Sequence, residues 1–233
     1  MEIEQLKRLA GEQAAAEVGD GTIVGLGTGS TAVWAIRRLG ERVRAGLRIV
    51  GVPTSEASRR LAEIEGIPLA TLDSVGELDL DLDGADQIDP DLNLIKGYGG
   101  ALLREKLVAL AARRFIVVAD DSKLVHRLGE HGPVPVEVVR FAWHTTRVRI
   151  EQLGCHVELR RQTSGDPFVT DEGHYVLDCH FAAIEHPQEI AQALKSLVGV
   201  VEHGLFLGIA TDVVIAHQNG AVEWRQHSYT NSA

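Results

Sequence analysis

The 233-residue sequence has little cysteine, few aromatic residues and no long apolar run. Its two cysteines, Cys155 and Cys179, are not accompanied by histidines at the spacing of a zinc site, and we expect two reduced thiols. The acidic, amphipathic N-terminus does not resemble an export signal. The longest apolar run, 107–112, is far shorter than the roughly 20 residues that a membrane helix needs. These absences predict a cytoplasmic protein with no metal site and no membrane segment.

Basic residues are scarce as well. The chain has 23 lysines and arginines against 33 acidic residues, a formal net charge of −10, so a nucleic-acid partner is not expected. The hydrophobic fraction of 45% is ordinary for a globular chain. The length corresponds to one large domain, or to a domain and a half.

The first half of the sequence alternates strand patterns with helical patterns. Such alternation predicts an α/β fold, a mostly parallel sheet with helices on both faces. We predict four helices. The first begins at residue 3 and stops at Gly19, and the second spans 31–39 and ends at Gly40. The third is capped by Thr54 or Ser55 and ends near Gly66, and the fourth spans 100–113. Predicted strands are 22–26, 48–52, 69–72, 78–82 and 115–119.

The pattern changes from about residue 133. Residues 133–136 alternate proline and valine, which is typical of a linker or an edge strand. Predicted helices at 145–153 and 187–197 and strands at 156–159 and 168–178 indicate a small α+β unit. Two last strands, 213–216 and 222–224, are expected to return to the first domain. We therefore predict one domain from 1–132 and 205–233, and a second, α+β domain from 133–204.

Four predicted strand-end loops carry residues suited to chemistry. The loop at 25–31 joins glycines to Ser30 and Thr31 at a helix start, which fits a phosphate monoester and equally a tight βα turn. It matches neither the dinucleotide fingerprint nor the P-loop. Asp83 and Asp86 follow the predicted strand 78–82, where they suit sugar hydroxyls, a divalent cation or an Asx turn.

The third and fourth loops supply the cations. Lys96 precedes a glycine loop and a helix that carries Glu105, and Lys123 follows a fully apolar strand. Only five of the 23 basic residues are lysine, which suggests that Lys96 stands where a compact ammonium is required. An exposed acid at a helix start and a solvated lysine in a capped turn are the plainer interpretations. Because strand ends of a parallel sheet meet at one edge, the four loops together suit a small phosphorylated sugar.

These segments resemble the type A ribose-5-phosphate isomerases. The resemblance covers nearly the whole chain in order, from GLGTGSTA at 25–32, PTSEAS at 53–58, DLDGAD at 81–86, KGYGGALLREK at 96–106 and ADDSK at 119–123 to GLFLGIATDVVIA at 204–216. It implies a Rossmann-like domain without a nucleotide, a ferredoxin-like lid and a homodimer or homotetramer. It also implies a cofactor-free aldose–ketose isomerase of the pentose phosphate pathway that interconverts ribose 5-phosphate and ribulose 5-phosphate.

The resemblance assigns roles by position. Glu105 matches the catalytic base, and Lys96, Asp83 and Asp86 match polar groups of the reacting centre, either aspartate being able to assist ring opening. Matches to the substrate-binding segments are Thr28, Gly29, Ser30, Thr31, Gly84, Ala85, Gly97, Tyr98, Gly99, Lys123 and, at the phosphate end, Lys7. Tyr98 departs from the family, which commonly has glycine in KGGG. Its side chain must point away from the sugar, or it narrows the pocket.

Two other classes remain open. A non-catalytic sugar-phosphate sensor would carry an additional DNA-reading segment, for which this chain offers no basic helix. An amino-sugar phosphate deaminase would release ammonia, and a CoA transferase would use a covalent glutamate and a thioester.

Overall fold

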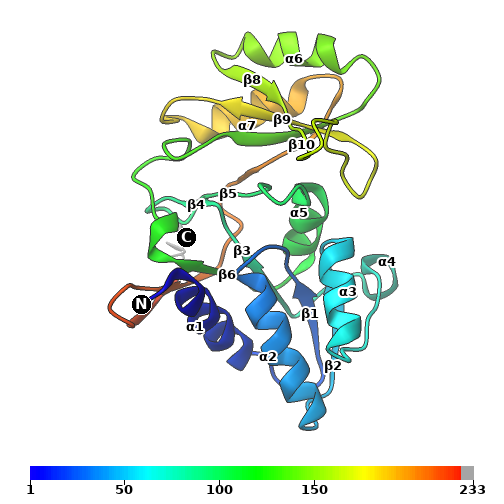
Figure 1. Ribbon diagram of the computed structural model, residues 1–233, viewed down its shortest axis with the longest axis vertical. Coiled ribbons are helices and arrows are strands. Elements are labelled where there is room, and N and C mark those ends of the chain that lie inside the picture. Colours follow the sequence, from blue (N-terminus) through cyan, green and yellow to red (C-terminus); the bar gives the residue numbers. More distant parts are fainter. Residues whose placement is uncertain (227–233) are drawn as a thin grey trace, which may run out of the picture. The chain divides into compact units, whose positions relative to one another are not determined.

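The computed structural model describes residues 1–226, which divide into two compact units (Figure 1). The first unit comprises Met1–Ala85, Leu107–Lys123 and the chain from Gly208. The second comprises Asp86–Lys106 and Leu124–Leu207. No helix among the described residues is long and apolar enough to span a bilayer.

A six-stranded sheet in the order β13-β12-β6-β3-β1-β2 forms the first unit. All neighbouring pairs are parallel except β12 and β13, so the predicted α/β class is confirmed. The chain continues from β1 to β2 on one side and later to β3 on the other, which makes the carboxyl ends of β1 and β3 a topological switch point. The strands are β1 (Thr22–Leu26), β2 (Ile49–Pro53), β3 (Leu80–Gly84), β6 (Phe115–Asp120), β12 (Asp212–Ala216) and β13 (Val222–Gln226).

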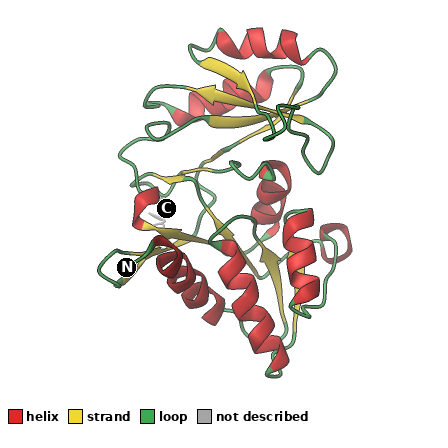
Figure 2. Ribbon diagram, in the orientation of Figure 1, coloured by secondary structure: helices red, strands yellow, loops and turns green. Residues whose placement is uncertain are grey.

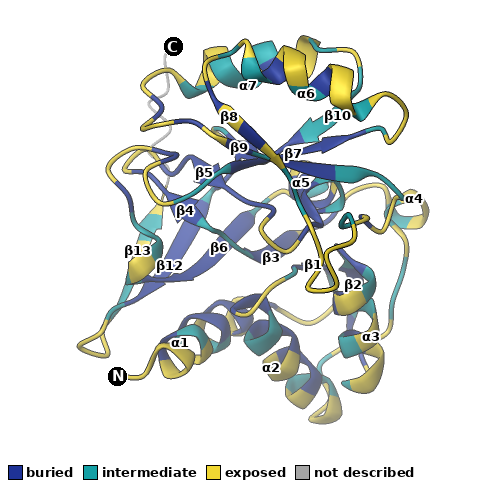
Figure 3. Ribbon diagram, turned by 45° about the horizontal axis from the view of Figure 1, so that its top comes forward, coloured by how far each residue is buried: buried dark blue, intermediate teal, exposed yellow. Residues whose placement is uncertain are grey.

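Helices cover both faces of this sheet (Figure 2). Three of them, α1 (Ile3–Ala16), α2 (Ala32–Arg44) and α3 (Glu56–Ile64), pack their apolar stripes on alternate strand residues such as Leu26 and Leu82. On the other face Val52 and Leu78 meet Val108, from the part of α5 (Leu102–Ala111) that belongs to this unit. Figure 3 shows the central strands buried and the helices exposed on their outer sides. The shorter α4 (Leu72–Val75) follows α3, and η1 (Asp121–Lys123) follows β6.

The second unit contains an antiparallel sheet in the order β10-β7-β9-β8 with two helices. The sequence of elements β-α-β-β-α-β with this strand order is ferredoxin-like, as expected. A smaller antiparallel sheet, β11-β5-β4, belongs to the same unit. The elements are β4 (Gln87–Ile88), β5 (Leu94–Ile95), β7 (Val134–Val138), α6 (Trp143–Glu151), β8 (His156–Leu159), β9 (Tyr175–His180), α7 (Pro187–Ser196), β10 (Val200–His203) and β11 (Leu205–Phe206).

The boundary between the units differs from the predicted division at residue 133. Residues 86–106 and 124–132 lie in the second unit. The reason is the small sheet, since β5 pairs with β11, more than 100 residues later in the chain. Short two-residue strands such as these leave no periodic pattern in the sequence.

One predicted strand is absent, and two predicted elements have different bounds. Residues 69–72 make only an isolated bridge between Gly51 and Leu69, and α4 begins at Leu72 after a capping box. Helix α2 continues through Gly40 to Arg44. Glycine is needed within the helix because the helix packs closely on Glu65 there, and a Cβ on Gly40 would lie 2.5 Å from the Glu65 Cβ. The strand predicted at 168–178 is restricted to β9, since a turn at 170–173 precedes it.

The segment 133–136 is neither a linker nor an edge strand. Strand β7 lies between β10 and β9 in the centre of its sheet. Pro135 is accommodated because the ladder with β10 starts at Val136, and the Pro135 carbonyl still accepts a hydrogen bond from Gly204 N at 2.7 Å. The missing N–H of the proline therefore falls beyond the end of the ladder with β10, while Pro135 still lies opposite Asp178 in the ladder with β9.

Candidate functional site

The loop after β1 is fixed to the end of β3. The backbone N–H of Thr28 donates to Asp83 Oδ1 at 2.9 Å, and Gly84 N donates to the same oxygen at 2.7 Å. A side chain at position 27 could not fit, because a Cβ there would lie 2.3 Å from Asp83 Oδ1. Gly29 adopts a positive φ of 112°, and α2 begins three residues later. The fully buried Asp83 carboxylate thus shapes the loop at the switch point.

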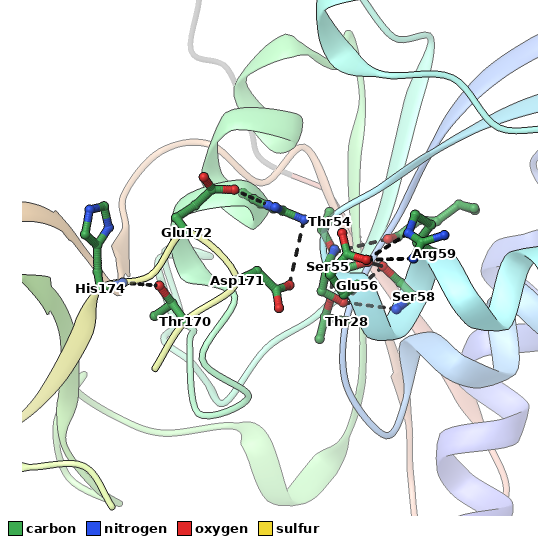
Figure 4. A network of polar contacts seen from close by, with 12 residues as sticks. Thr28, Thr54, Ser55, Glu56, Ser58, Arg59, Thr170, Asp171, Glu172 and His174 are labelled. Carbon is green, nitrogen blue, oxygen red and sulfur yellow. Dashed lines mark hydrogen bonds and ion pairs between the residues drawn. The ribbon is translucent and has the colours of Figure 1, made fainter. Parts of the chain in front are cut away.

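Hydroxyl groups gather around Thr28 (Figure 4). Its Oγ1 lies 2.7 Å from Thr54 Oγ1 and donates to Ser55 Oγ at 2.7 Å. Ser55 in turn caps α3 by accepting from Ser58 N at 3.0 Å. The sequence predicts only a helix cap at Thr54 or Ser55, because their contact with Thr28 depends on the pairing of β1 with β2. Of the other predicted loop residues, Ser30 is exposed and Thr31 is buried.

Two lysines of the first unit were predicted to bind phosphate. Lys123 ends η1, directly after β6, and is partly buried. Lys7 forms an ion pair of 2.6 Å with Glu4 on α1, and this hydrogen bond lowers the pKa of Glu4. Asp120, at the end of β6, was not among the predicted site residues. It is fully buried, its Oδ1 accepts from Ser122 N at 3.1 Å, and its Oδ2 accepts no hydrogen bond from the described residues.

The second unit brings Lys96 and Glu105 together. Lys96 follows β5, and Glu105 lies in the first turn of α5. Lys96 Nζ is 3.7 Å from Glu105 Oε1, and the two side chains are only 3% and 4% exposed. Each charge therefore compensates the other in a region that excludes water. Because 3.7 Å exceeds ordinary hydrogen-bond length, the pair is not closed by a short bond between these two atoms.

The loop between Lys96 and α5 is held by side chains from distant segments. Asp86 Oδ2 accepts from Tyr98 N at 2.9 Å. Arg160 donates to the carbonyl oxygens of Gly97 at 2.7 Å and Tyr98 at 3.0 Å, and forms an ion pair with Asp178. Arg160 was not among the predicted site residues, since nothing in the sequence distinguishes it from the other arginines.

The Tyr98 side chain points toward β4 and the segment before β7. Its hydroxyl accepts from Gln87 Nε2 at 3.2 Å and lies beside Gly132, where a Cβ would be 2.2 Å away. Gln87 Oε1 also accepts from Gly129 N at 2.8 Å. Burial raises the pKa of the Tyr98 phenol. The ring thus occupies a defined place in the second unit.

Asp83 and Asp86, three residues apart, belong to different units. The Asp83 carboxylate accepts from the backbone of Thr28 and Gly84 in the first unit. The Asp86 carboxylate accepts from the backbone of Tyr98 in the second. Of the remaining predicted residues, Ala85 ends the first segment of the first unit and Gly99 lies in the loop before α5.

A second buried cation lies next to Glu105 in the sequence. Lys106 Nζ is 2.8 Å from Glu202 Oε1 and donates to the carbonyl of His203 at 2.6 Å. Burial raises the pKa of Glu202, but Lys106 and Lys195 outweigh that effect and hold this pKa at about 2. Burial and the positive charge of Lys106 lower the pKa of His203 to about 4.

Polar contacts also order the turn before β9. Thr170 Oγ1 accepts from His174 N at 3.1 Å, as Figure 4 shows, and donates to Glu137 Oε1 at 2.9 Å. Glu137 lies 2.8 Å from the His174 ring, and burial raises the pKa of its carboxyl. Arg104 on α5 donates to Glu172 at 2.6 Å, so this turn is tied to the helix that carries Glu105.

Known proteins resemble this chain along nearly its whole length. The family model of ribose 5-phosphate isomerase A (phosphoriboisomerase A) matches residues 50–220. A protein of Synechococcus sp. (strain JA-3-3Ab) named ribose-5-phosphate isomerase A is 54% identical over 96% of this chain and 98% of its own. Its namesake from Gloeobacter violaceus is 52% identical over 94% of this chain and 96% of its own.

Solved structures agree with the sequence comparison. A D-ribose-5-phosphate isomerase in complex with phospho-erythronic acid superposes with a TM-score of 0.93 at 39% identity. The ribose 5-phosphate isomerase from Plasmodium falciparum superposes with a TM-score of 0.94 at 35% identity. Each match covers 97% of this chain and the whole of the other. The chain therefore belongs to the ribose 5-phosphate isomerase A family and is an enzyme, a pentose-phosphate isomerase.

Proposed function

We propose that the chain interconverts ribose 5-phosphate and ribulose 5-phosphate through an enediolate, with Glu105 as the base. The observation that carries the proposal is the buried pair, with Lys96 Nζ 3.7 Å from Glu105 Oε1. Aldose–ketose isomerisation removes a proton from C2 of the open-chain aldose and returns it to C1. One carboxylate within reach of both carbons suffices, and a glutamate has the same task in triosephosphate isomerase on another fold.

Lys96 supplies the complementary charge. Negative charge develops on the oxygens at C1 and C2 as the proton leaves, and a fixed ammonium in a buried site stabilises it. The side chain is already desolvated at 3% exposure, so little reorganisation is needed during the reaction.

The first unit offers groups suited to the phosphate. Backbone N–H groups and hydroxyls at 29–31 lie at the start of α2, where the N–H groups of a helix start and the helix dipole favour an anion. Lys123 and Lys7 would add positive charge. The phospho-erythronic acid bound by a related isomerase is itself a phosphorylated acid, which supports a phosphate site in this family.

The two aspartates are proposed to act on the sugar hydroxyls. Ribose 5-phosphate is mostly a closed furanose, so a carboxylate must relay a hydroxyl proton during ring opening. Asp83 and Asp86 both remain candidates for this role. Gly84 and Ala85 of the first unit and the 97–99 loop of the second are proposed as substrate-binding segments.

The Glu105→Gln variant tests the proposal. The amide keeps the size of the side chain but has no basic oxygen, so we expect kcat to fall by about 10²–10⁴-fold with substrate binding retained. The measurement is a coupled assay of ribulose 5-phosphate formation with EDTA present. Glu185→Gln, at an exposed carboxylate of the same unit, is the matched control and should leave the rate unchanged. A near-normal kcat in Glu105→Gln assigns the base elsewhere.

Three other measurements distinguish the alternative classes of protein. Release of ammonia from an amino-sugar phosphate would indicate a deaminase, and a requirement for a thioester would indicate a CoA transferase. A folded protein that binds ribose 5-phosphate without turnover would be a sensor. Each of these results would replace the isomerase proposal for this chain.

We also propose that the enzyme is a cytoplasmic homodimer or homotetramer. Two large side chains of the second unit, Phe141 at 90% and Val198 at 82% exposure, support a subunit contact. Light scattering of the full chain measures the mass directly. A monomer at micromolar concentration would contradict this proposal without affecting the chemistry.

A further inference from the structure

The guanidinium group of Arg160 binds two consecutive carbonyl oxygens of the loop that precedes α5. Its Nη1 donates to Gly97 O at 2.7 Å and to Tyr98 O at 3.0 Å. Its Nε and Nη2 donate to the two carboxylate oxygens of Asp178. A planar guanidinium that is held by both oxygens of a carboxylate keeps a fixed direction. Arg160 therefore presents one oriented donor group to the loop.

The two bound carbonyls set the direction of two peptide groups. A trans peptide group is planar, and its C=O and N–H point in opposite directions. The Gly97 carbonyl faces Arg160, and the N–H of the same peptide group, that of Tyr98, donates to Asp86 Oδ2 at 2.9 Å. The Tyr98 carbonyl also faces Arg160, so the N–H of Gly99 points away from the guanidinium. Arg160 thus orients the amide groups at 98 and 99.

The end of the loop is fixed by a contact of the same arginine. Gly100 has a positive φ of 82°, and a Cβ there would lie 2.3 Å from Phe168 Cζ. Phe168 N donates to Arg160 O at 2.9 Å, and the guanidinium carbon lies 6.0 Å from the centre of the Phe168 ring. The segment that packs on Gly100 and the group that binds the loop carbonyls therefore move together.

Arg160 and Asp178 are anchored in the four-stranded sheet of the second unit. Asp178 lies on the inner strand β9, opposite Pro135 on β7 and Glu158 on β8. Arg160 directly follows β8, and its backbone N–H donates to Val176 O at 2.9 Å. The two side chains are only 13% and 17% exposed, so water weakens their ion pair little. The sheet therefore determines where the loop carbonyls lie.

We propose that Arg160, oriented by Asp178, is a positioning residue that holds the peptide groups at 97–99 in the orientation that the reacting sugar requires. The inference rests on the proposed function, in which this loop binds the substrate. Charge develops on the sugar oxygens only as the reaction proceeds, so a loosened loop lowers kcat more than it raises KM.

The Arg160→Gln variant removes the guanidinium from the full chain. We expect kcat to fall about tenfold, with KM within about threefold of the wild type. Arg161→Gln is the matched control and should leave the rate unchanged, because this neighbouring arginine is exposed and donates to Gly165 O in its own turn. A wild-type kcat in Arg160→Gln overturns the proposal.

The shape of the donor group is tested by Arg160→Lys. Lysine keeps the positive charge but offers one ammonium in place of the planar fork, so its kcat should lie between those of the wild type and Arg160→Gln. A wild-type kcat in Arg160→Lys would show that charge alone is sufficient and overturn the proposal.

The role of Asp178 is tested by Asp178→Asn. Because the carboxylate acts through the guanidinium, Asp178→Asn should lower kcat in the wild-type background and add no further loss to Arg160→Gln. Losses that multiply in the double variant would show that Asp178 does not act through Arg160 and overturn this part of the proposal.

Hydrogen exchange separates a local role from a general loss of stability, without using turnover. The amide hydrogen of Tyr98, which bonds to Asp86, should exchange about tenfold faster in Arg160→Gln than in the wild type. The amide hydrogen of Val125, which bonds to Ile88 O at 3.0 Å in the same unit, should keep its rate.

Each outcome of the exchange experiment is decisive. Equal acceleration at both amides would show that Arg160 only stabilises the unit, and no acceleration at Tyr98 would show that Arg160 does not hold the loop. Both results overturn the proposal. Acceleration at Tyr98 alone, in a chain whose wild type has no isomerase activity, would retain the contact and reject the proposed function.

Discussion

The two compact units hold their polar groups in different ways. In the first unit, the Thr28 hydroxyl joins a network of neutral hydroxyl groups, and the Thr28 backbone N–H donates to the buried Asp83 carboxylate. In the second unit, two lysine ammonium groups are buried, each next to a carboxylate. A buried charge needs a partner of opposite sign, whereas hydroxyls satisfy one another locally. Removing one charge from the second unit should therefore cost more than removing one group from the first.

The largest expected effect is that of Lys96→Met. The variant keeps an unbranched apolar stem but loses the ammonium, so we expect kcat to fall by about 10²–10³-fold, as when one oxyanion donor is removed. Steady-state kinetics measure the loss, and circular dichroism checks folding, because Glu105 is then left buried without this cation. Lys195→Met, at a half-exposed lysine of the same unit, is the control. An active Lys96→Arg variant would show that a compact ammonium is not required.

The next largest effect is the loss of folding stability that protonation of His203 causes. Its pKa is about 4 in the folded chain and about 6.5 when unfolded, so the unfolded state binds the proton first on acidification. Stability from this group is complete above about pH 6.5 and is lost as the pH falls toward 4, by roughly 2 kcal/mol between pH 7 and pH 5. Urea unfolding at the two pH values measures this loss.

Two histidine variants serve as controls for this pH effect. His203→Gln should lose less stability than the wild type between pH 7 and pH 5, since glutamine does not titrate. His156→Gln, which removes an exposed ring, should behave like the wild type. An equal pH dependence in His203→Gln and the wild type would mean that His203 is not buried as a neutral ring.

A smaller effect is expected in the first unit from Lys123→Met. If its role is uniform binding of the phosphate, KM rises about tenfold and kcat changes less than about twofold. Steady-state kinetics with ribose 5-phosphate measure both constants, and Lys195→Met again serves as the control. A fall in kcat without a change in KM would place Lys123 at the reacting carbons and remove the contrast between the units.

The polar groups of the two units also differ in how far the sequence predicts their contacts. The loop at 25–31 lies between a strand and a helix that are contiguous in the chain, so its local pattern was sufficient to predict strand, loop and helix start. The pairing of Lys96 with Glu105 was also predictable, because the two residues are separated only by a glycine loop and one helical turn.

The partners contributed from distant segments were not predictable. The second-unit site includes Arg160 just after β8, Glu202 in β10 and Phe206 in β11, whose ring centroid is 5.6 Å from Lys96 Nζ. These residues lie 64 to 110 positions after Lys96 in the sequence. Two-residue strands have no measurable periodicity, and an arginine or phenylalanine that supports a site does not differ in sequence from one in a core. The register of those strands, which only the folded chain shows, determines the contacts.

The smallest effect concerns Tyr98, where the family commonly has glycine. Tyr98→Phe removes the hydroxyl that accepts from Gln87 and should destabilise the chain by about 0.5–1.5 kcal/mol. The backbone N–H at position 98 still donates to Asp86, so kcat and KM should stay within about twofold of the wild type. Urea unfolding and steady-state kinetics measure the two quantities, and Tyr98→Gly extends the series to the common family residue. A large fall of KM in Tyr98→Gly alone would mean that the ring narrows the sugar pocket instead of stabilising the contacts with Gln87 and Gly132.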